Sequence, residues 1–128
     1  MFSNSRAGAT VLVVEDYADT RYLLRVMLEI RGYQVIEAAD GRQAVEMAAT
    51  ASPELILMDL NLPVLNGFEA TRQIHEQPAM RDVPIVAVSA QCGGEYRQRA
   101  LDAGCLDCVQ KPIDFEMMGE VLTRYLHD

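Results

Sequence analysis

The sequence predicts a single α/β domain in which five parallel strands alternate with five helices. Short apolar runs alternate with segments of helical period along the whole chain. The middle run, residues 55–59, is apolar on both alternating faces, as a strand covered by helices on both sides requires. No linker, repeat or low-complexity segment interrupts the pattern. This alternation is typical of right-handed βαβ units around a parallel sheet.

Composition narrows the class of protein. The chain has 128 residues, half of them apolar, which fits one globular domain. Its formal net charge of −8 argues against direct binding to nucleic acid, because phosphate recognition needs clustered Lys and Arg. The sequence contains neither a run of membrane-spanning length nor a signal-peptide core, so a cytoplasmic location is expected without membrane insertion. Three cysteines, an odd number, predict reduced thiols rather than a disulfide framework.

The chain is expected to begin with a flexible tail, residues 1–9, followed by the folded domain, residues 10–128. The first strand is predicted over residues 10–14, where an apolar run ends in two carboxylates. A helical period begins at Asp19 and is closed by Gly32 as the residue after the helix. One apolar face of this helix is predicted to contain Leu23, Met27 and Ile30.

A second, shorter strand is predicted over residues 34–37, and the central strand follows the break at Pro53. The helices on either side of the central strand both begin with capping-box spacing, in which an acceptor side chain precedes Gln or Glu by three residues. These pairs are Asp40 with Gln43, and Asn66 with Glu69. The third helix must stop before Pro78, because the residue before a proline disfavours helical geometry.

The fourth strand is predicted over residues 84–88 and ends in Ser89. Two glycines, at positions 93 and 94, loosen the start of a fourth helix that ends at Gly104. The fifth strand, residues 106–110, runs into Lys111-Pro112. The apolar face of a last helix is predicted from Phe115, Met118, Leu122 and Tyr125.

Charged and hydroxylic residues follow several predicted strands at their carboxyl ends. They are Glu15, Asp16, Asp59, Ser89 and Lys111. In a parallel sheet these ends share one edge, where ligands of open α/β folds bind. Crowded carboxylates need a positive partner, and Mg²⁺ accepts such oxygen ligands. An ionised Asp can attack phosphorus to form an aspartyl phosphate, while a lysine and a hydroxyl neutralise phosphoryl oxygens.

Four motifs in this order resemble the receiver domains of bacterial two-component response regulators of the chemotaxis-regulator type. The motifs are Val13-Val14-Glu15-Asp16, Met58-Asp59-Leu60-Asn61-Leu62-Pro63 with Asn66-Gly67, Val88-Ser89-Ala90, and Lys111-Pro112. The resemblance extends from about residue 10 to residue 125. It implies a flavodoxin-like doubly wound sheet with strand order 2-1-3-4-5, the order for which a receiver of this type is a standard example.

The resemblance also implies a role for each matched residue. Asp59 would accept the phosphoryl group, and Ser89 and Lys111 would contact it. Asp16, Asp59 and the backbone carbonyl of Asn61 would bind Mg²⁺ or Mn²⁺ directly. Glu15 would reach the ion through water.

Other matched positions are expected to transmit the switch. Ala90 leaves room for a phosphoryl oxygen, Gln91 and Asn61 occupy positions where relatives vary the phosphoryl lifetime, and Pro112 would follow a cis peptide bond. Cys108 stands where relatives usually carry Tyr or Phe. Because a thiol cannot report the switch as a ring does, the output is expected to use the loop at Gly93 or another surface.

The function expected from this resemblance is that of a stand-alone receiver, without enzymatic activity beyond its own phosphorylation and dephosphorylation. Its partners would be a sensor histidine kinase or a histidine phosphotransfer protein, and a downstream protein target. A monomer or weak dimer is expected. Two alternatives stay open: an adaptor that binds its partner without phosphorylation, and one receiver domain of a hybrid kinase or longer regulator.

Other functions fit the residues less well. Glu15 and Asp16 would repel the phosphate of a bound flavin mononucleotide. A phosphatase of the haloacid dehalogenase type would need a second Asp where Asn61 stands. Cys105 and Cys108 form a C-x-x-C pair, but residues three apart on a strand point to opposite faces, so a shared metal or redox site is not expected.

Overall fold

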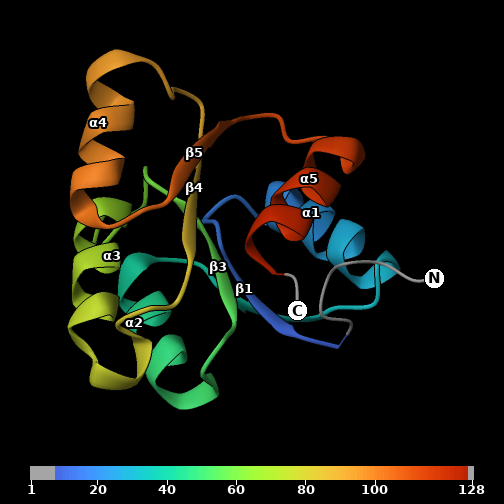
Figure 1. Cartoon of the computed structure of the whole chain (residues 1–128), viewed down its shortest axis with the longest axis horizontal. Helices are drawn as coiled ribbons and strands as arrows, with labels where there is room; N and C mark the ends of the chain where they lie inside the picture. Colours follow the sequence, from blue (N-terminus) through green and yellow to red (C-terminus); the bar gives the residue numbers. More distant parts are fainter. Residues whose placement is uncertain (1–7, 127–128) are drawn as a thin grey trace.

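Five parallel strands form the central layer of the computed structural model, which describes residues 8–126 (Figure 1). Their spatial order is β2-β1-β3-β4-β5, as the resemblance implied. The strands are β1 (Thr10–Val14), β2 (Gln34–Ala38), β3 (Leu55–Asp59), β4 (Ile85–Ser89) and β5 (Asp107–Gln110). The helices are α1 (Ala18–Ile30), α2 (Gly41–Ala51), α3 (Gly67–Glu76), the short 3₁₀ helix η1 (Pro78–Met80), α4 (Gly94–Ala103) and α5 (Phe115–Tyr125).

Helices cover both faces of the sheet. Figure 1 shows α1 and α5 on one side and α2, α3 and α4 on the other. Alternate residues of β3 supply the two cores: Ile56 and Met58 pack with α2, α3 and α4, whereas Leu55 and Leu57 pack with α1 and α5. All five β3 residues are buried, which explains why this segment is apolar at every position but its last.

The strand order reverses between β1 and β3. From β1 the chain first adds β2 on one side and then crosses to β3 on the other, with Val14 opposite Met58. The carboxyl ends of β1 and β3 therefore flank the crevice in which open α/β sheets bind ligands.

Both predicted N-caps are confirmed. The Asp40 carboxylate accepts a hydrogen bond from the Gln43 backbone N–H at 2.8 Å, and the Asn66 side chain accepts one from Glu69 at 2.9 Å. These acceptors satisfy backbone donors that a helix leaves unpaired in its first turn. Gly32, with φ of 93°, follows the end of α1 as predicted.

The predicted inner face of α1 was wrong in part. Leu24, Met27 and Leu28 are buried, whereas Leu23 and Ile30 are exposed. The apolar residues of this helix cover more than one stripe, and only packing against the sheet decides which stripe is buried. Phe115 of α5 is likewise exposed, and it lies under the Arg31 guanidinium at 4.0 Å from the ring centroid.

The predicted tail, residues 1–9, lies outside the described residues except for its last two. Ala9 is buried, and the Gly8 N–H donates to the Gly32 carbonyl at 3.1 Å. Residues 127 and 128 of the predicted domain are also outside the described range. Within residues 8–126, no helix combines the length and the apolar composition needed to cross a membrane.

Candidate functional site

Three carboxylates meet at the carboxyl edge of the sheet, as the sequence predicted. Glu15 and Asp16 follow β1, and Asp59 is the last residue of the neighbouring strand β3. One oxygen from each of the three lies within 4.8 Å of the others. Glu15 is 2% exposed and Asp59 is 4% exposed, while Asp16 faces solvent. The buried pair therefore lies at the floor of the site and Asp16 at its rim.

Lys111 brings its ammonium group to two of these carboxylates. Its Nζ lies 2.7 Å from Glu15 Oε1 and 3.4 Å from Asp59 Oδ2. The Lys111 backbone N–H donates to the Ser89 carbonyl at 2.8 Å, which ties the end of β5 to the end of β4. The peptide bond from Lys111 to Pro112 is cis, which confirms the expectation.

Burial and the neighbouring charges shift the pKa values of Glu15 and Lys111. Burial raises the pKa of Glu15, and the bonds from Lys111 and the Tyr17 N–H offset that effect only in part, while the charge of Asp59 adds to it. Burial lowers the pKa of Lys111, but Glu15 and Asp59 outweigh burial and the net pKa is raised. Lys111 pairs with two of the three clustered carboxylates, so among the described residues the cluster holds more carboxylates than its one ammonium can neutralise.

This donor set fits a hard divalent cation. Carboxylate oxygens at this spacing are the ligands that Mg²⁺ prefers, and a dication offsets the charge that Lys111 leaves uncompensated. The Asn61 backbone N–H donates to Asp59 Oδ1 at 3.0 Å, so the main chain of Asn61 lies beside the same carboxylate. The individual metal-binding roles of these residues stay predictions.

Ser89 ends β4 at the same edge and is buried. It lies one residue beyond Val88, which pairs with Asp59 in the sheet. Its hydroxyl accepts a hydrogen bond from the Gln91 N–H at 3.3 Å, and the side chains of Ala90 and Gln91 are exposed. The loop after β4 is therefore connected to the site through Ser89, and the switching roles assigned to these residues stay predictions.

One supporting residue, Arg21, was missed by the sequence analysis, and Gly67 was named only as part of a motif, without its packing role. Arg21 of α1 donates to the Glu15 carbonyl at 2.8 Å and to Glu37 Oε1 at 2.9 Å, so it holds the peptide that carries Glu15. Gly67 begins α3 directly against β3, and a Cβ there would lie 2.6 Å from Leu60 Cα and overlap the Asp59 carbonyl. A glycine directly after the cap residue Asn66 could have indicated this close approach. No sequence motif indicates the role of Arg21, because its partners belong to other elements.

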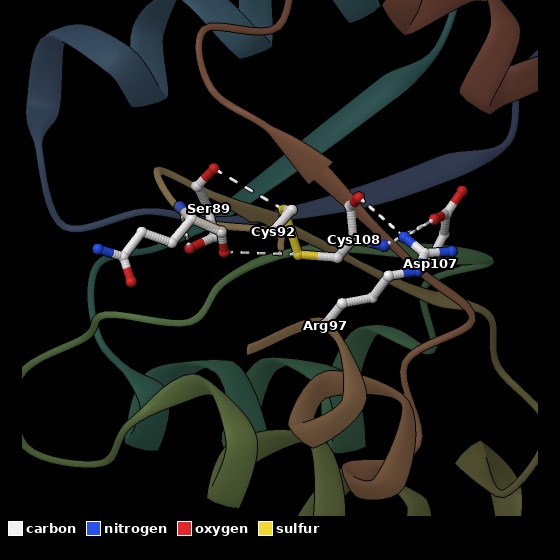
Figure 2. The surroundings of a disulfide bond; sticks show 6 residues. Ser89, Cys92, Arg97, Asp107 and Cys108 are labelled. Carbon is white, nitrogen blue, oxygen red and sulfur yellow. Dashed lines mark hydrogen bonds and ion pairs between the residues drawn. A yellow bond between two sulfur atoms is a disulfide. The ribbon is translucent and has the colours of Figure 1, made fainter. Parts of the chain in front are cut away.

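The prediction that all three cysteines are reduced thiols was wrong. Cys92, in the loop before α4, forms a disulfide with Cys108 of β5 (Figure 2). Cys108 pairs with Ala87 in the sheet, and the loop that follows β4 folds back over β5 to meet it. Cys105 takes no part in this bond. It is buried, and its Sγ forms a hydrogen bond with the Thr71 hydroxyl, at a sulfur-to-oxygen distance of 3.8 Å. The C-x-x-C pair therefore forms no shared site.

Comparison with known proteins agrees with this geometry. The model of the response regulator receiver domain matches residues 11–123. The polar-differentiation response regulator DivK of Brucella ovis is 33% identical over 119 residues, which cover 93% of this chain and 97% of DivK.

Solved structures show the same likeness. The receiver domain of a sensor histidine kinase from Pseudomonas aeruginosa, which holds a magnesium ion in its active-site cleft, is 39% identical with a TM-score of 0.87. The match covers 93% of this chain and 98% of that one. The chemotaxis protein CheY4 of Vibrio cholerae is 32% identical with a TM-score of 0.89, over 94% of this chain and 100% of that one.

The matched segment runs from β1 to α5 and includes every residue of the acidic site and Lys111. Members of this family are typically signalling phosphoacceptors rather than enzymes that act on other substrates. The chain belongs to the response regulator receiver domain family of two-component signalling.

Proposed function

We propose that this chain accepts a phosphoryl group on the Asp59 carboxylate from a phosphohistidine of a sensor histidine kinase or a histidine phosphotransfer protein. One observation carries the proposal: Asp59 lies within 4.8 Å of two further carboxylates and 3.4 Å from the Lys111 ammonium. This arrangement combines a nucleophile with groups that neutralise phosphoryl oxygens.

The reaction is a substitution at phosphorus. An oxygen of Asp59 forms the new bond, the bond from phosphorus to the histidine nitrogen breaks, and the imidazole leaves with a proton from solvent. Lys111 pairs with one phosphoryl oxygen, and the Ser89 hydroxyl donates to another. Mg²⁺ or Mn²⁺, held by Asp16, Asp59 and the Asn61 carbonyl with Glu15 through water, supplies further charge neutralisation when bound.

The output is a change in a protein-binding surface. Ser89 is connected to Ala90 and Gln91 in the loop before α4, and this loop contacts Cys108 on β5. Reorienting the Ser89 hydroxyl toward a phosphoryl group would break its bond to Gln91 and move the loop. A downstream protein that binds the loop, α4 or the segment after Pro112 would detect this movement.

The test is the intact mass of the protein after incubation with acetyl phosphate, with and without Mg²⁺. Wild type is expected to gain one phosphoryl group only with Mg²⁺, and Asp59→Asn none, because an amide is not a nucleophile. Asp102→Asn, which changes an exposed carboxylate on α4, is the matched control and should behave as wild type. An equal gain in Asp59→Asn would overturn the proposal.

A second role is favoured by the likeness to a receiver domain of a sensor histidine kinase, at 39% identity. In that role the chain passes its phosphoryl group on to a histidine phosphotransfer protein. Mixing the phosphorylated chain with such a protein separates the two roles. A relay transfers the label to histidine, whereas a terminal switch retains it on Asp59 or loses it to water.

A further inference from the structure

The disulfide joins the loop that leaves the site to the strand that brings Lys111 into it. Cys92 lies three residues after Ser89, and Cys108 lies three residues before Lys111. The Cα atoms of the two cysteines are 5.6 Å apart, within the range that a disulfide requires. The two cysteines are 16 residues apart in the sequence, and the whole of α4 lies between them. The bond therefore closes a covalent loop that contains α4.

Two backbone carbonyl oxygens lie near the two sulfur atoms of the bond. Cys92 Sγ lies 4.0 Å from the Ser89 carbonyl oxygen, and Cys108 Sγ lies 3.9 Å from the Gln91 carbonyl oxygen (Figure 2). In the oxidised state these are contacts, because a disulfide sulfur carries no hydrogen. After reduction the two sulfur atoms must move apart, and each thiol would have a nearby carbonyl oxygen to which it can donate.

The bond can be reached from solvent at one end. Cys92 is partly exposed and is followed by the exposed Gly93 and Gly94, whereas Cys108 is buried. A reductant can therefore attack Cys92, and Cys108 is released as the leaving thiolate. The third cysteine does not compete: burial raises the pKa of Cys105 to about 11, although the Thr71 hydroxyl acts in the opposite direction, so its thiol stays protonated and unreactive.

The same bond restrains the Ser89 hydroxyl. Gln91 donates its N–H to that hydroxyl at 3.3 Å, and the Gln91 carbonyl lies against Cys108. Because Cys92 is bonded to Cys108, Gln91 cannot leave β5 without also moving the strand that carries Lys111. Reorientation of Ser89 is therefore restricted in the oxidised chain and allowed in the reduced one.

We propose that Cys92 and Cys108 form a reversible redox switch, whose oxidised state clamps the loop after Ser89 onto β5 and slows phosphoryl acceptance by Asp59. The effect on Asp59 rests on the function proposed above, whereas the redox reaction and the clamp do not. In the forward step, a hydroperoxide accepts two electrons and two protons from the thiols and leaves as water and an alcohol, or as two waters from hydrogen peroxide. A dithiol reverses the step and becomes a disulfide itself.

The first measurement counts thiols. Wild type is treated with hydrogen peroxide or with dithiothreitol, denatured, alkylated with iodoacetamide and weighed. One label is expected on the oxidised protein and three on the reduced protein, since the chain has three cysteines. Cys105→Ala is the matched control and should carry no label when oxidised and two labels when reduced. Cys92→Ser should show two labels in both states, and three labels on oxidised wild type would overturn the proposal.

The second measurement tests the clamp without any phosphoryl group. Amide hydrogen exchange of residues 90–94 should become faster on reduction of wild type and of Cys105→Ala. In Cys92→Ser, which lacks the bond, exchange should be fast in both states. Identical exchange in oxidised and reduced wild type would show that the bond does not restrain the loop, and would overturn the switch.

The third measurement is the initial rate of phosphorylation by acetyl phosphate with Mg²⁺. Oxidised wild type should be slower than reduced wild type by at least about fivefold, the lower end of typical coupling between two sites. Dithiothreitol should restore the rate, and Cys92→Ser should match reduced wild type in both conditions. Equal rates in the two states would overturn the coupling. Absence of phosphorylation in both states would instead count against the proposed function, while the thiol count and the exchange would still decide the clamp.

Discussion

Two clusters of charged side chains lie near each other, and only one has balanced charges. Between α1 and β2, Arg21 and Arg25 both bind Glu37, and Arg25 also binds Glu29, so two cations face two carboxylates. At the carboxyl edge of the sheet, Lys111 is the one described cation paired with the acidic site, through Glu15 and Asp59, while Asp16 is a third carboxylate beside them. The first cluster has as many cations as carboxylates, whereas the second has more carboxylates than cations among the described residues and fits the divalent cation proposed above.

The pKa values express the same difference. Burial acts to raise the pKa of Glu37, but hydrogen bonds from Arg25 and Arg21 outweigh it and the net pKa is lowered. For Glu15, burial dominates and the pKa is raised. A carboxylate whose pKa is lowered stabilises the fold when it is ionised, whereas one whose pKa is raised destabilises it. Glu37 therefore stabilises the fold when it is ionised, whereas ionised Glu15 does not.

Removing the single cation of the acidic site should have the largest effect. Lys111→Met is expected to slow phosphorylation by acetyl phosphate about 10²- to 10³-fold, as for loss of one electrostatic group in a transition state. Initial rates from intact mass measure the change. Arg72→Met removes a cation from an exposed pair with Glu69 and is the matched control. A wild-type rate in Lys111→Met would contradict its proposed contact with the phosphoryl group.

Removing a rim carboxylate should weaken the metal rather than the fold. Asp16→Asn is expected to lower Mg²⁺ affinity at least about tenfold, because an amide oxygen offers no full charge to the ion. Isothermal titration calorimetry gives the affinity. Glu29→Gln removes an equal charge from the balanced cluster and should leave it unchanged. An unchanged affinity in Asp16→Asn would place the metal site elsewhere.

The same Glu to Gln change should affect stability differently in the two clusters. Glu37→Gln is expected to lower the free energy of unfolding by about 1 kcal/mol at neutral pH, since two partly exposed charged hydrogen bonds weaken. Because the pKa of Glu37 is lowered, its stabilisation is complete above its ordinary value of 4.5 and is lost as pH falls through the lower folded value. Urea unfolding of wild type and Glu37→Gln at a series of pH values measures the difference in their free energies of unfolding. This difference should disappear below the folded-state pKa of Glu37.

Glu15 should show the opposite dependence without Mg²⁺. Its raised pKa means that the folded state holds the proton more tightly than the unfolded state does. The contribution of Glu15 to the free energy of unfolding is therefore greatest below pH 4.5, and it declines as pH rises through the raised pKa of Glu15 in the folded state. Glu15→Gln should abolish this decline in the same urea experiments. A decline that persists in the variant would show that another group is responsible.

The smallest effect is expected at the exposed edge of the balanced cluster. Glu29→Gln should change the free energy of unfolding by about 0.5 kcal/mol or less, because its pair with Arg25 lies one helical turn apart on the surface of α1. Its phosphorylation rate should equal that of wild type. A loss above about 1 kcal/mol would show that Glu29 is an essential part of the cluster.

Local pattern was sufficient to predict the acidic site. Each of its residues ends or follows a strand, and the parallel arrangement alone brings strand ends to one edge, so Glu15, Asp59 and Lys111 were predicted together. The caps at Asp40 and Asn66 were also predictable, because a cap and its partner are three residues apart.

Features that depend on packing were not predictable in this way. The buried stripe of α1 contains Leu24 rather than Leu23, a choice made by the sheet beneath it. The disulfide depends on how the loop after β4 folds over β5, and the spacing of Cys92 and Cys108 does not reveal that path. Arg21 donates to Glu15 and Glu37 from a third element, so no short motif contains the interaction.

The close approach of Gly67 to β3 also limits which substitutions this sequence can accept. Any other residue at position 67 introduces a Cβ against the peptide of Asp59. Even a small uncharged side chain there is therefore expected to displace Asp59. Asn at position 59 is expected to keep the fold, because it is close to Asp in size and shape, and to lose only the proposed phosphoryl acceptance. In a saturation library the two positions would therefore be depleted for different reasons: Asp59 in a selection for signalling, and Gly67 already in a selection for folded protein.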